Sequence, residues 1–225
     1  MANVSLTWLG HAGFRLDGAG KRVYIDPWLD NPKFPESERE IERIDVLVLT
    51  HGHSDHVGSA LDLCKQHSPA VACMIEIGDW LTTQGAEVDG FNKGGTVDFD
   101  GVRVTLTDAR HSSSLPDGMY AGEAAGVVVE LDGTRFYHAG DTCVFGDMQL
   151  IARLYEPDVA ILPIGGFYTM DPREAAVALE LLGVRRCVPC HYGTFPLLSG
   201  TPDELRKLAP GVEIIAPEPG ESVEV

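Results

Sequence analysis

The amino-acid sequence predicts an α/β fold in which two β-sheets pack face to face and helices cover both outer surfaces, a four-layer αββα sandwich. Strand-rich segments are each followed by helical segments, twice along the chain, and this order is typical of such a sandwich. No low-complexity linker or charge block divides the 225 residues, and hydrophobic residues make up 44%, which is enough for a sizeable core. We therefore expect residues 1–225 to form a single domain.

The first half of the chain is predicted from short apolar segments separated by turns rich in Gly and Asp, such as Asp17-Gly18-Ala19-Gly20. Strands are expected at residues 4–8, 13–16, 23–26 and 46–50. Two helices are expected after them, at residues 59–66 and 77–84.

The second half repeats this order, with strands expected at residues 102–108, 126–131 and 134–138. Asp132-Gly133 between the last two is a strong signal for a two-residue hairpin turn. Further on we expect a helix at 147–155, a buried strand at 159–162, a helix at 172–182, a strand at 187–190 and a helix at 202–208. Asp171 is the expected N-cap of the helix at 172–182, which has Pro172 in its first turn and Gly183 at its end.

Composition restricts the partners of the protein. The formal net charge is −17, from 34 acidic and 17 basic residues, and no run of Lys and Arg interrupts it, which argues against a nucleic-acid partner. The N-terminus lacks the features of a signal peptide, and no segment approaches the ~20 apolar residues of a membrane span. Five cysteines without regular spacing favour a reducing, cytoplasmic setting. A small-molecule substrate is the expected partner, and a homo-oligomer is left open.

Residues 50–58 read Thr-His-Gly-His-Ser-Asp-His-Val-Gly and carry the chemistry of the chain. Three histidines and one aspartate lie within six positions, directly after an apolar strand, and both residue types bind Zn, Mn, Fe or Ni. Their spacing is not that of one helix face, so we expect a loop that wraps round its metals, with Gly52 and Gly58 relaxing the backbone on either side. Four ligands this dense point to two metals rather than one.

This segment resembles the His-x-His-x-Asp-His signature of the metallo-β-lactamase superfamily, whose αββα fold agrees with the predicted one. The superfamily completes its site with a His, an Asp and a His after later strands, and His111, Asp141 and His191 follow in that order. Flanking segments resemble a branch of largely uncharacterised metal-dependent hydrolases similar to L-ascorbate-6-phosphate lactonases and, more distantly, N-acylphosphatidylethanolamine phospholipases D. These segments are Trp8-Leu-Gly-His-Ala-Gly-Phe, Ile25-Asp-Pro-Trp, Phe91-Asn-Lys-Gly-Gly and Leu162-Pro-Ile-Gly-Gly.

The resemblance implies a role for each ligand. A first metal would be held by His51, His53 and His111, and a second by Asp55, His56 and His191. Asp141 would bridge the two ions, for which Zn is the first choice and Mn, Fe or Ni are alternatives. Two ions sharing a water lower its pKa and stabilise both the attacking and the leaving oxygen. His53 favours the hydrolytic members, because the superfamily's di-iron redox members have a glutamate at this position.

The expected function is therefore hydrolysis by a metal-bridging hydroxide of an ester bond, a lactone or a phosphodiester, in a small molecule. The candidate catalytic residues are Asp141, Asp55 and His11. Two alternatives remain open: a mononuclear iron oxygenase acting on sulfur compounds, and a metal-containing binding protein without activity.

Three further residues have two interpretations each. His11 is either an ordinary turn histidine or, as its place in the resembling branch implies, a residue beside the active site. Asp26 either starts a turn or accepts the free ring N–H of a ligand histidine, as metal-bound imidazoles usually require. We expect His138 to pack or to support the site rather than to bind metal, and His67 to lie at the surface at a helix end.

Two other predictions concern cysteines and loops. Cys187 and Cys190 spell C-x-x-C, but they lie on a predicted strand without a second such pair, so we expect them to pack as small apolar residues. The substrate pocket is expected between loops at residues 92–95, 112–122 and 165–169.

Overall fold

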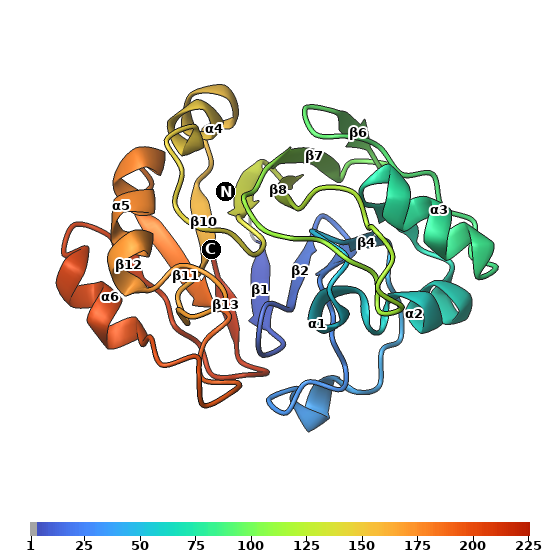
Figure 1. Ribbon diagram of the computed structural model, residues 1–225, viewed down its shortest axis with the longest axis horizontal. Coiled ribbons are helices and arrows are strands. Elements are labelled where there is room, and N and C mark those ends of the chain that lie inside the picture. The colour runs from blue at the N-terminus through green and yellow to red at the C-terminus, as the bar shows by residue number, and fades with distance from the viewer. Residues whose placement is uncertain (1–3) are drawn as a thin grey trace.

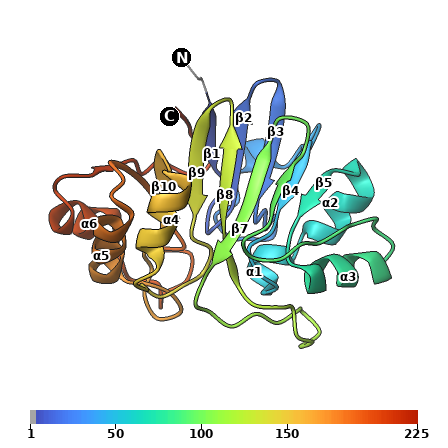
Figure 2. The ribbon, with the colours of Figure 1, turned by 90° about the horizontal axis from the view of Figure 1, so that it is seen from above.

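The structure is a computed structural model that describes residues 4–225, and residues 1–3 of the predicted domain lie outside the described part. Two β-sheets pack face to face, and helices lie on the outer side of each sheet (Figure 1 and Figure 2). The predicted αββα sandwich is therefore confirmed.

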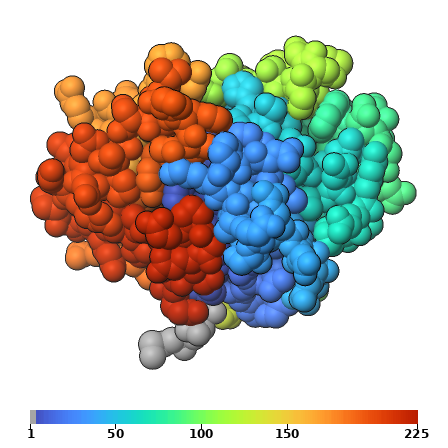
Figure 3. All heavy atoms as spheres, turned by 90° about the horizontal axis from the view of Figure 1, so that it is seen from below, coloured from blue at the N-terminus to red at the C-terminus, as the bar shows by residue number. Residues whose placement is uncertain are grey.

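The first sheet has six strands in the order β13-β1-β2-β3-β4-β5. Its strands are β1 (Ser5–Trp8), β2 (Phe14–Gly18), β3 (Lys21–Ile25), β4 (Val46–Val48), β5 (Ala70–Ala72) and β13 (Ser222–Glu224). The final strand β13 pairs antiparallel with β1, so both ends of the described chain lie in one sheet. Figure 3 shows the C-terminal segment against the N-terminal part of the chain.

The second sheet has seven strands in the order β12-β11-β10-β9-β8-β7-β6. Its strands are β6 (Thr96–Asp98), β7 (Arg103–Asp108), β8 (Ala125–Leu131), β9 (Thr134–His138), β10 (Val159–Pro163), β11 (Arg186–Cys190) and β12 (Glu213–Ile214). Strands β6 to β9 are antiparallel and β9 to β12 are parallel.

Helices form the two outer layers. Beside the first sheet lie α1 (Ser54–Val57), α2 (Ala60–His67) and α3 (Ile75–Thr83), after the short 3-10 helix η1 (Glu36–Glu38). Beside the second sheet lie α4 (Met148–Tyr155), α5 (Pro172–Leu182) and α6 (Pro202–Leu208). Among residues 4–225, no helix is long and apolar enough to cross a membrane.

Strand β10 shows how the layers are packed. Val159 and Ile161 belong to the core between the two sheets, whereas Ala160 and Leu162 face the helices on the outer side. Successive side chains of a strand point to opposite faces, so a strand covered on both faces must be apolar throughout. This explains the continuous apolar segment that predicts the strand.

Local signals predicted three features correctly. The side chain of Asp171 accepts hydrogen bonds from the backbone N–H groups of Arg173 and Glu174, both at 2.9 Å, and so caps α5. Gly183 ends that helix in the left-handed conformation, with φ of 64°. Asp132 and Gly133 both have positive φ, as the tight turn between β8 and β9 requires.

The strands that the sequence did not predict are short and lie at sheet edges. Strands β5, β6, β12 and β13 have two or three residues each and are the outermost strands of their sheets. An edge strand pairs on one side only and needs no long apolar segment. Such a strand therefore lacks the apolar pattern from which strands are predicted.

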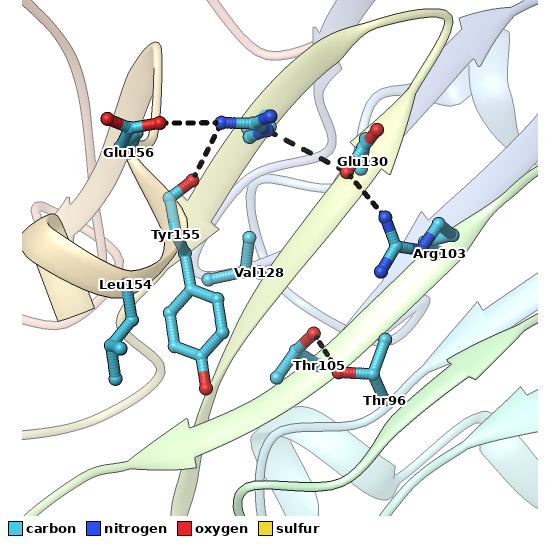
Figure 4. A pocket seen from close by; sticks show the side chains of 9 residues that line it. Thr96, Arg103, Thr105, Val128, Glu130, Leu154, Tyr155 and Glu156 are labelled. Atoms are coloured by element: carbon cyan, nitrogen blue, oxygen red, sulfur yellow. Dashed lines mark hydrogen bonds and ion pairs between the residues drawn. The ribbon is translucent and has the colours of Figure 1, made fainter.

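The outer face of β7 and β8 beside α4 is hollowed into a shallow pocket (Figure 4). Its charged side chains pair with one another: Arg103 lies 3.3 Å from Glu130, and Arg135 lies 3.7 Å from Glu130 and 3.5 Å from Glu156. Because every charged group that lines this pocket has an ionic partner, we assign it no ligand.

Candidate metal centre

Strands of both sheets end at one edge of the sandwich, where α1 also lies (Figure 2). In the first sheet β3 and β4 are parallel, and β1 runs in the same direction because β2 is antiparallel to both β1 and β3. In the second sheet β7 and β9 share a direction in the same way, and β11 follows it through β10. The polar residues that follow these strands therefore meet at one place.

The segment that follows β4 differs from the loop that the sequence predicts. Ser54–Val57 forms one turn of α-helix with His53 at its N-cap, so Asp55 and His56 project from helical backbone. Gly52 and Gly58 are required by close approach rather than by backbone freedom. A Cβ at Gly52 would lie 2.2 Å from Cβ of Ala121, and one at Gly58 would lie 2.2 Å from the carbonyl oxygen of Ser54.

The first candidate ligand group consists of His51, His53 and His111, the set that the resemblance implies. One ring nitrogen of each lies within 4.8 Å of the others, and Nε2 of His51 is 3.0 Å from Nδ1 of His53. His51 is buried, whereas His53 and His111 are half-buried and face the cavity described below.

The second candidate ligand group consists of Asp55, His56 and His191, and its potential ligand atoms also lie within 4.8 Å of one another. Nε2 of His191 is 3.8 Å and Nε2 of His56 is 3.9 Å from Oδ2 of Asp55. His11 belongs to the same cluster, because its Nε2 lies 3.0 Å from Oδ2 of Asp55.

Asp141 lies between the two groups. Its Oδ2 is 3.6 Å from Nε2 of His111, which belongs to the first group, and 3.1 Å from Nε2 of His191, which belongs to the second. Its Oδ1 is 3.5 Å from Nε2 of His56. The carboxylate thus faces both groups, which is the position that a bridging ligand needs.

Three of these ligand atoms are buried and make no hydrogen bond within residues 4–225: Nε2 of His56, Nε2 of His191 and Oδ1 of Asp141. Buried polar atoms are normally hydrogen-bonded, because an unpaired one costs free energy. Here the unpaired atoms converge on a common space and are nitrogen and oxygen donors suited to a divalent cation. The residues therefore fit metal ions.

Asp26 holds His56 from the side away from the ligand group. Its Oδ2 accepts a hydrogen bond from Nδ1 of His56 at 2.7 Å, while Thr50 donates to the same carboxylate through its N–H and its hydroxyl. Of the two interpretations of Asp26, the structure therefore favours acceptance of the ring N–H.

The other three histidines lie in different surroundings. His11 is completely buried and is hydrogen-bonded between Asp55 and the hydroxyl of Thr194, so it touches a candidate ligand. His138 is also buried, but its ring bonds to the backbone of Ala12 and Gly140, in agreement with the expected packing role. His67 is the last residue of α2 and is half-buried.

The two groups differ in their acid–base state. Burial lowers the pKa of His51, His53 and His111, so these rings are neutral and able to bind a cation at neutral pH. Burial opposes protonation of His56 and His191 as well, but the charge of Asp141 outweighs it. The pKa of His56 is raised well above its ordinary value, and that of His191 is raised to about 9. A bound cation would replace these protons.

A cavity of about 880 Å³ opens above the ligand groups, within the usual size range of small-molecule sites. It is lined by Trp28, His53, Ser54, Asp55, His111, Ser112, Asp141, Tyr168, His191, Phe195, Pro196 and Leu197. Ser112 and Tyr168 come from two of the loops that we expected to border the pocket. The third expected loop, residues 92–95, is not part of the lining, because Gly94 and Gly95 hydrogen-bond to Leu106 of β7.

The apolar side of this cavity was not predicted from the sequence. It is formed by Trp28, Phe195, Pro196 and Leu197. The last three form a short apolar segment in the loop that follows His191. An apolar segment in a loop close to a predicted ligand is the signal that could have revealed them. Cys187 and Cys190 are free and buried, as expected.

Comparison with known proteins identifies the family. The model of the "Beta-lactamase superfamily domain" matches residues 21–192. A "UPF0173 metal-dependent hydrolase" of Herpetosiphon aurantiacus is 48% identical over 99% of this chain and 98% of its own length. One from Korarchaeum cryptofilum is 47% identical over 99% of this chain and all of its own length.

Solved structures agree. Igni18, described as a novel metallo hydrolase from the archaeon Ignicoccus hospitalis, is 38% identical with a TM-score of 0.90, covering 99% of this chain and 98% of its own. An isothiocyanate hydrolase from Delia radicum gut bacteria has a TM-score of 0.74 over 97% of this chain and 98% of its own, but at 23% identity it shows the shared fold alone. The chain thus belongs to the beta-lactamase superfamily, in its branch of UPF0173 metal-dependent hydrolases.

Proposed function

We propose that this metal-dependent hydrolase cleaves an ester bond, a lactone or a phosphodiester, in a small molecule at a dinuclear metal centre. The observation that supports it most strongly is the position of Asp141. Its carboxylate faces ligand nitrogens of both groups, at 3.6 Å from His111 and 3.1 Å from His191. A single ion would leave one of the two groups without a partner.

The cations themselves would be held by His51, His53 and His111 on one side and by Asp55, His56 and His191 on the other, with Asp141 between them. When bound, two divalent ions supply Lewis acidity and lower the pKa of water towards neutrality. Zn is the first expectation, with Mn, Fe and Ni as alternatives, because a mixed histidine and carboxylate ligand set suits all four.

The residues of the chain orient and shield this chemistry. Asp26 fixes the ring of His56 through its Nδ1, and His11 fixes the carboxylate of Asp55. Asp141 is buried at the base of the cavity, where it can accept a proton or hold a water by hydrogen bonding. His53, His111 and Ser112 also line the cavity.

The cellular setting is part of the proposal. All five cysteines are free, which fits a reducing compartment such as the cytoplasm. The substrate is a small molecule, because the cavity is of that size. Assembly into a homo-oligomer is compatible with this function.

The test is elemental analysis of protein purified without added metal or a histidine tag, together with lactonase and phosphodiesterase assays in Zn²⁺ and in Mn²⁺. We expect close to two metals per chain and turnover that a chelator removes and metal restores. One iron per chain with oxygen consumption would favour the oxygenase instead. Bound metal without any turnover would favour the binding protein.

A further inference from the structure

The cavity above the metal ligands has two chemically different sides. Its floor carries the ligand side chains, and one wall is apolar or aromatic. The wall consists of Trp28, Tyr168, Phe195, Pro196 and Leu197. We call this set the apolar wall.

The apolar wall is held open rather than collapsed onto the core. Phe195 and Leu197 are 36% and 50% exposed, although their neighbour Leu198 is buried. Backbone hydrogen bonds from Leu198 to Phe195 and from Gly193 to Leu198 fix the loop in this conformation. Clustered exposed apolar side chains at the mouth of a cavity mark a binding surface, because leaving them in water costs free energy.

The apolar wall is also joined to the reacting end of the cavity. The ring of Phe195 lies 6.1 Å from that of Trp28 and 5.7 Å from that of His11, measured between centroids. His11 in turn contacts Asp55 of the second ligand group. A group packed on this wall therefore lies directly beside the bond to be cleaved.

Charge restricts the substrate further. No Lys or Arg is among the residues that line the cavity, and the net charge of the chain is −17. A carboxylate or phosphate placed on the apolar wall would lose its hydration without gaining a cationic partner, which is costly.

We propose that the substrate carries an uncharged aliphatic or aromatic group next to its scissile ester, and that this group packs on the apolar wall. This inference rests on the proposed function. Substrates that carry a second anionic group at this place are excluded by the same wall.

The test compares three p-nitrophenyl esters on metal-loaded protein: the acetate, the hexanoate and the monoester of hexanedioic acid, which equals the hexanoate in chain length but ends in a carboxylate. Each buried methylene contributes about fourfold. We expect kcat/KM for the hexanoate to exceed that for the acetate and that for the charged ester by about tenfold or more. Equal values for all three would overturn the proposal.

Variants of the apolar wall test whether the preference for the hexanoate arises there. Phe195→Ala and Leu197→Ala should reduce the ratio of hexanoate to acetate turnover to within about threefold, because lost packing affects the longer chain more. Leu150→Ala removes a leucine of similar exposure, 46% against 50% for Leu197, from α4 outside this cavity and should preserve the ratio. The proposal would be contradicted if the hexanoate-to-acetate ratio fell only in Leu150→Ala. It would also be contradicted if both wall variants kept the ratio of the wild type.

A binding measurement separates this inference from the proposed function. The neutral fluorescent dye N-phenyl-1-naphthylamine should bind the wild type and Leu150→Ala equally, and both wall variants several-fold more weakly. If dye binding follows this pattern but no ester is hydrolysed, the proposed function fails and the apolar site stands. If esters are hydrolysed but the wall variants bind the dye as tightly as the wild type does, the inference fails. It also fails if the wall variants convert a dimer into monomers.

Discussion

Nδ1 of His56 donates a hydrogen bond of 2.7 Å to Oδ2 of Asp26, and both side chains are completely buried. The bond leaves Nε2 of His56 without a proton once a cation is present, so this nitrogen can serve as a ligand. It also raises the basicity of the ring. Asp26 thus orients a candidate metal ligand through the ring nitrogen that faces away from the ligand group.

Asp26→Asn should weaken metal binding about 10- to 100-fold, the usual effect of losing a carboxylate behind a ligand histidine. Competition with a chromogenic chelator measures it. Asp108→Asn is the matched control, because Asp108 also lies at the end of a strand but pairs with Lys93 rather than with a histidine. Equal affinities in the two variants would show that Asp26 does not tune His56.

Asp141→Ala should abolish metal-dependent turnover and reduce the metal content below two per chain, because the carboxylate faces both ligand groups. The control is Asp147→Ala, six residues further on and exposed. Activity assays and elemental analysis of both proteins check this. Retained turnover in Asp141→Ala would refute the assigned bridge.

His11→Phe should affect the second ligand group selectively. The new ring keeps the packing against Trp28 and Phe195 but removes the hydrogen bond to Asp55. We expect affinity for one of two metals to fall about 10- to 100-fold, so that a brief chelator challenge leaves one metal per chain. Full metal content with lost turnover would instead show that His11 acts on the substrate.

Metal-free protein should be most stable near pH 6.5. The pKa of His191 rises from 6.5 to about 9, so its stabilising protonation is complete below 6.5 and is lost as the pH rises through 9. The pKa of His11 falls from 6.5 to about 4 through burial, so its charging destabilises the fold as the pH falls below 6.5. Urea unfolding across this range measures both effects.

The stability of metal-loaded protein should not fall between pH 6.5 and 9, because bound cations would replace the protons near His191. A metal-loaded protein that loses as much stability as the metal-free one between pH 6.5 and 9 would contradict this account.

Gly52→Ala should destabilise the fold by about 1–3 kcal/mol, the usual cost of overpacking. The added Cβ would lie 2.2 Å from Cβ of Ala121, so the loop of Ala121 must move. Gly146→Ala is the control, because a Cβ there meets nothing within 4 Å. Urea unfolding should show a change within about 0.5 kcal/mol for the control. Equal effects in both variants would contradict the close-approach argument.

The central strands could be predicted from the sequence for one physical reason, whereas the order of the candidate ligands came from the resemblance. A strand that is covered on both faces must be apolar, as β10 is, and a polar residue directly after such a strand stands out. His51, Asp141 and His191 follow strands that are mostly buried on both faces. His111 is the exception, because it follows β7, whose outer face is polar. The convergence of these four residues on one edge depends on strand direction, which no local pattern of residues shows, and the resemblance implied only that they share one site.

The apolar wall and the partners of His11 could not be predicted in this way. Phe195 and Leu197 lie in an irregular loop, where no periodicity shows which side chain faces the cavity. The contact of His11 with Asp55 joins residues 44 positions apart through tertiary structure alone. Edge strands such as β12, two residues long, were missed because sheet pairing rather than local preference forms them.

Each candidate ligand group contains residues that follow strands of both sheets. His51 and His53 follow a strand of the first sheet while His111 follows one of the second, and Asp55 and His56 face His191 in the same way. Bound ions would therefore act as cross-links that clamp the two sheets together at this edge. Removing them should let that edge open, and it should speed amide hydrogen exchange there while the opposite edge stays closed.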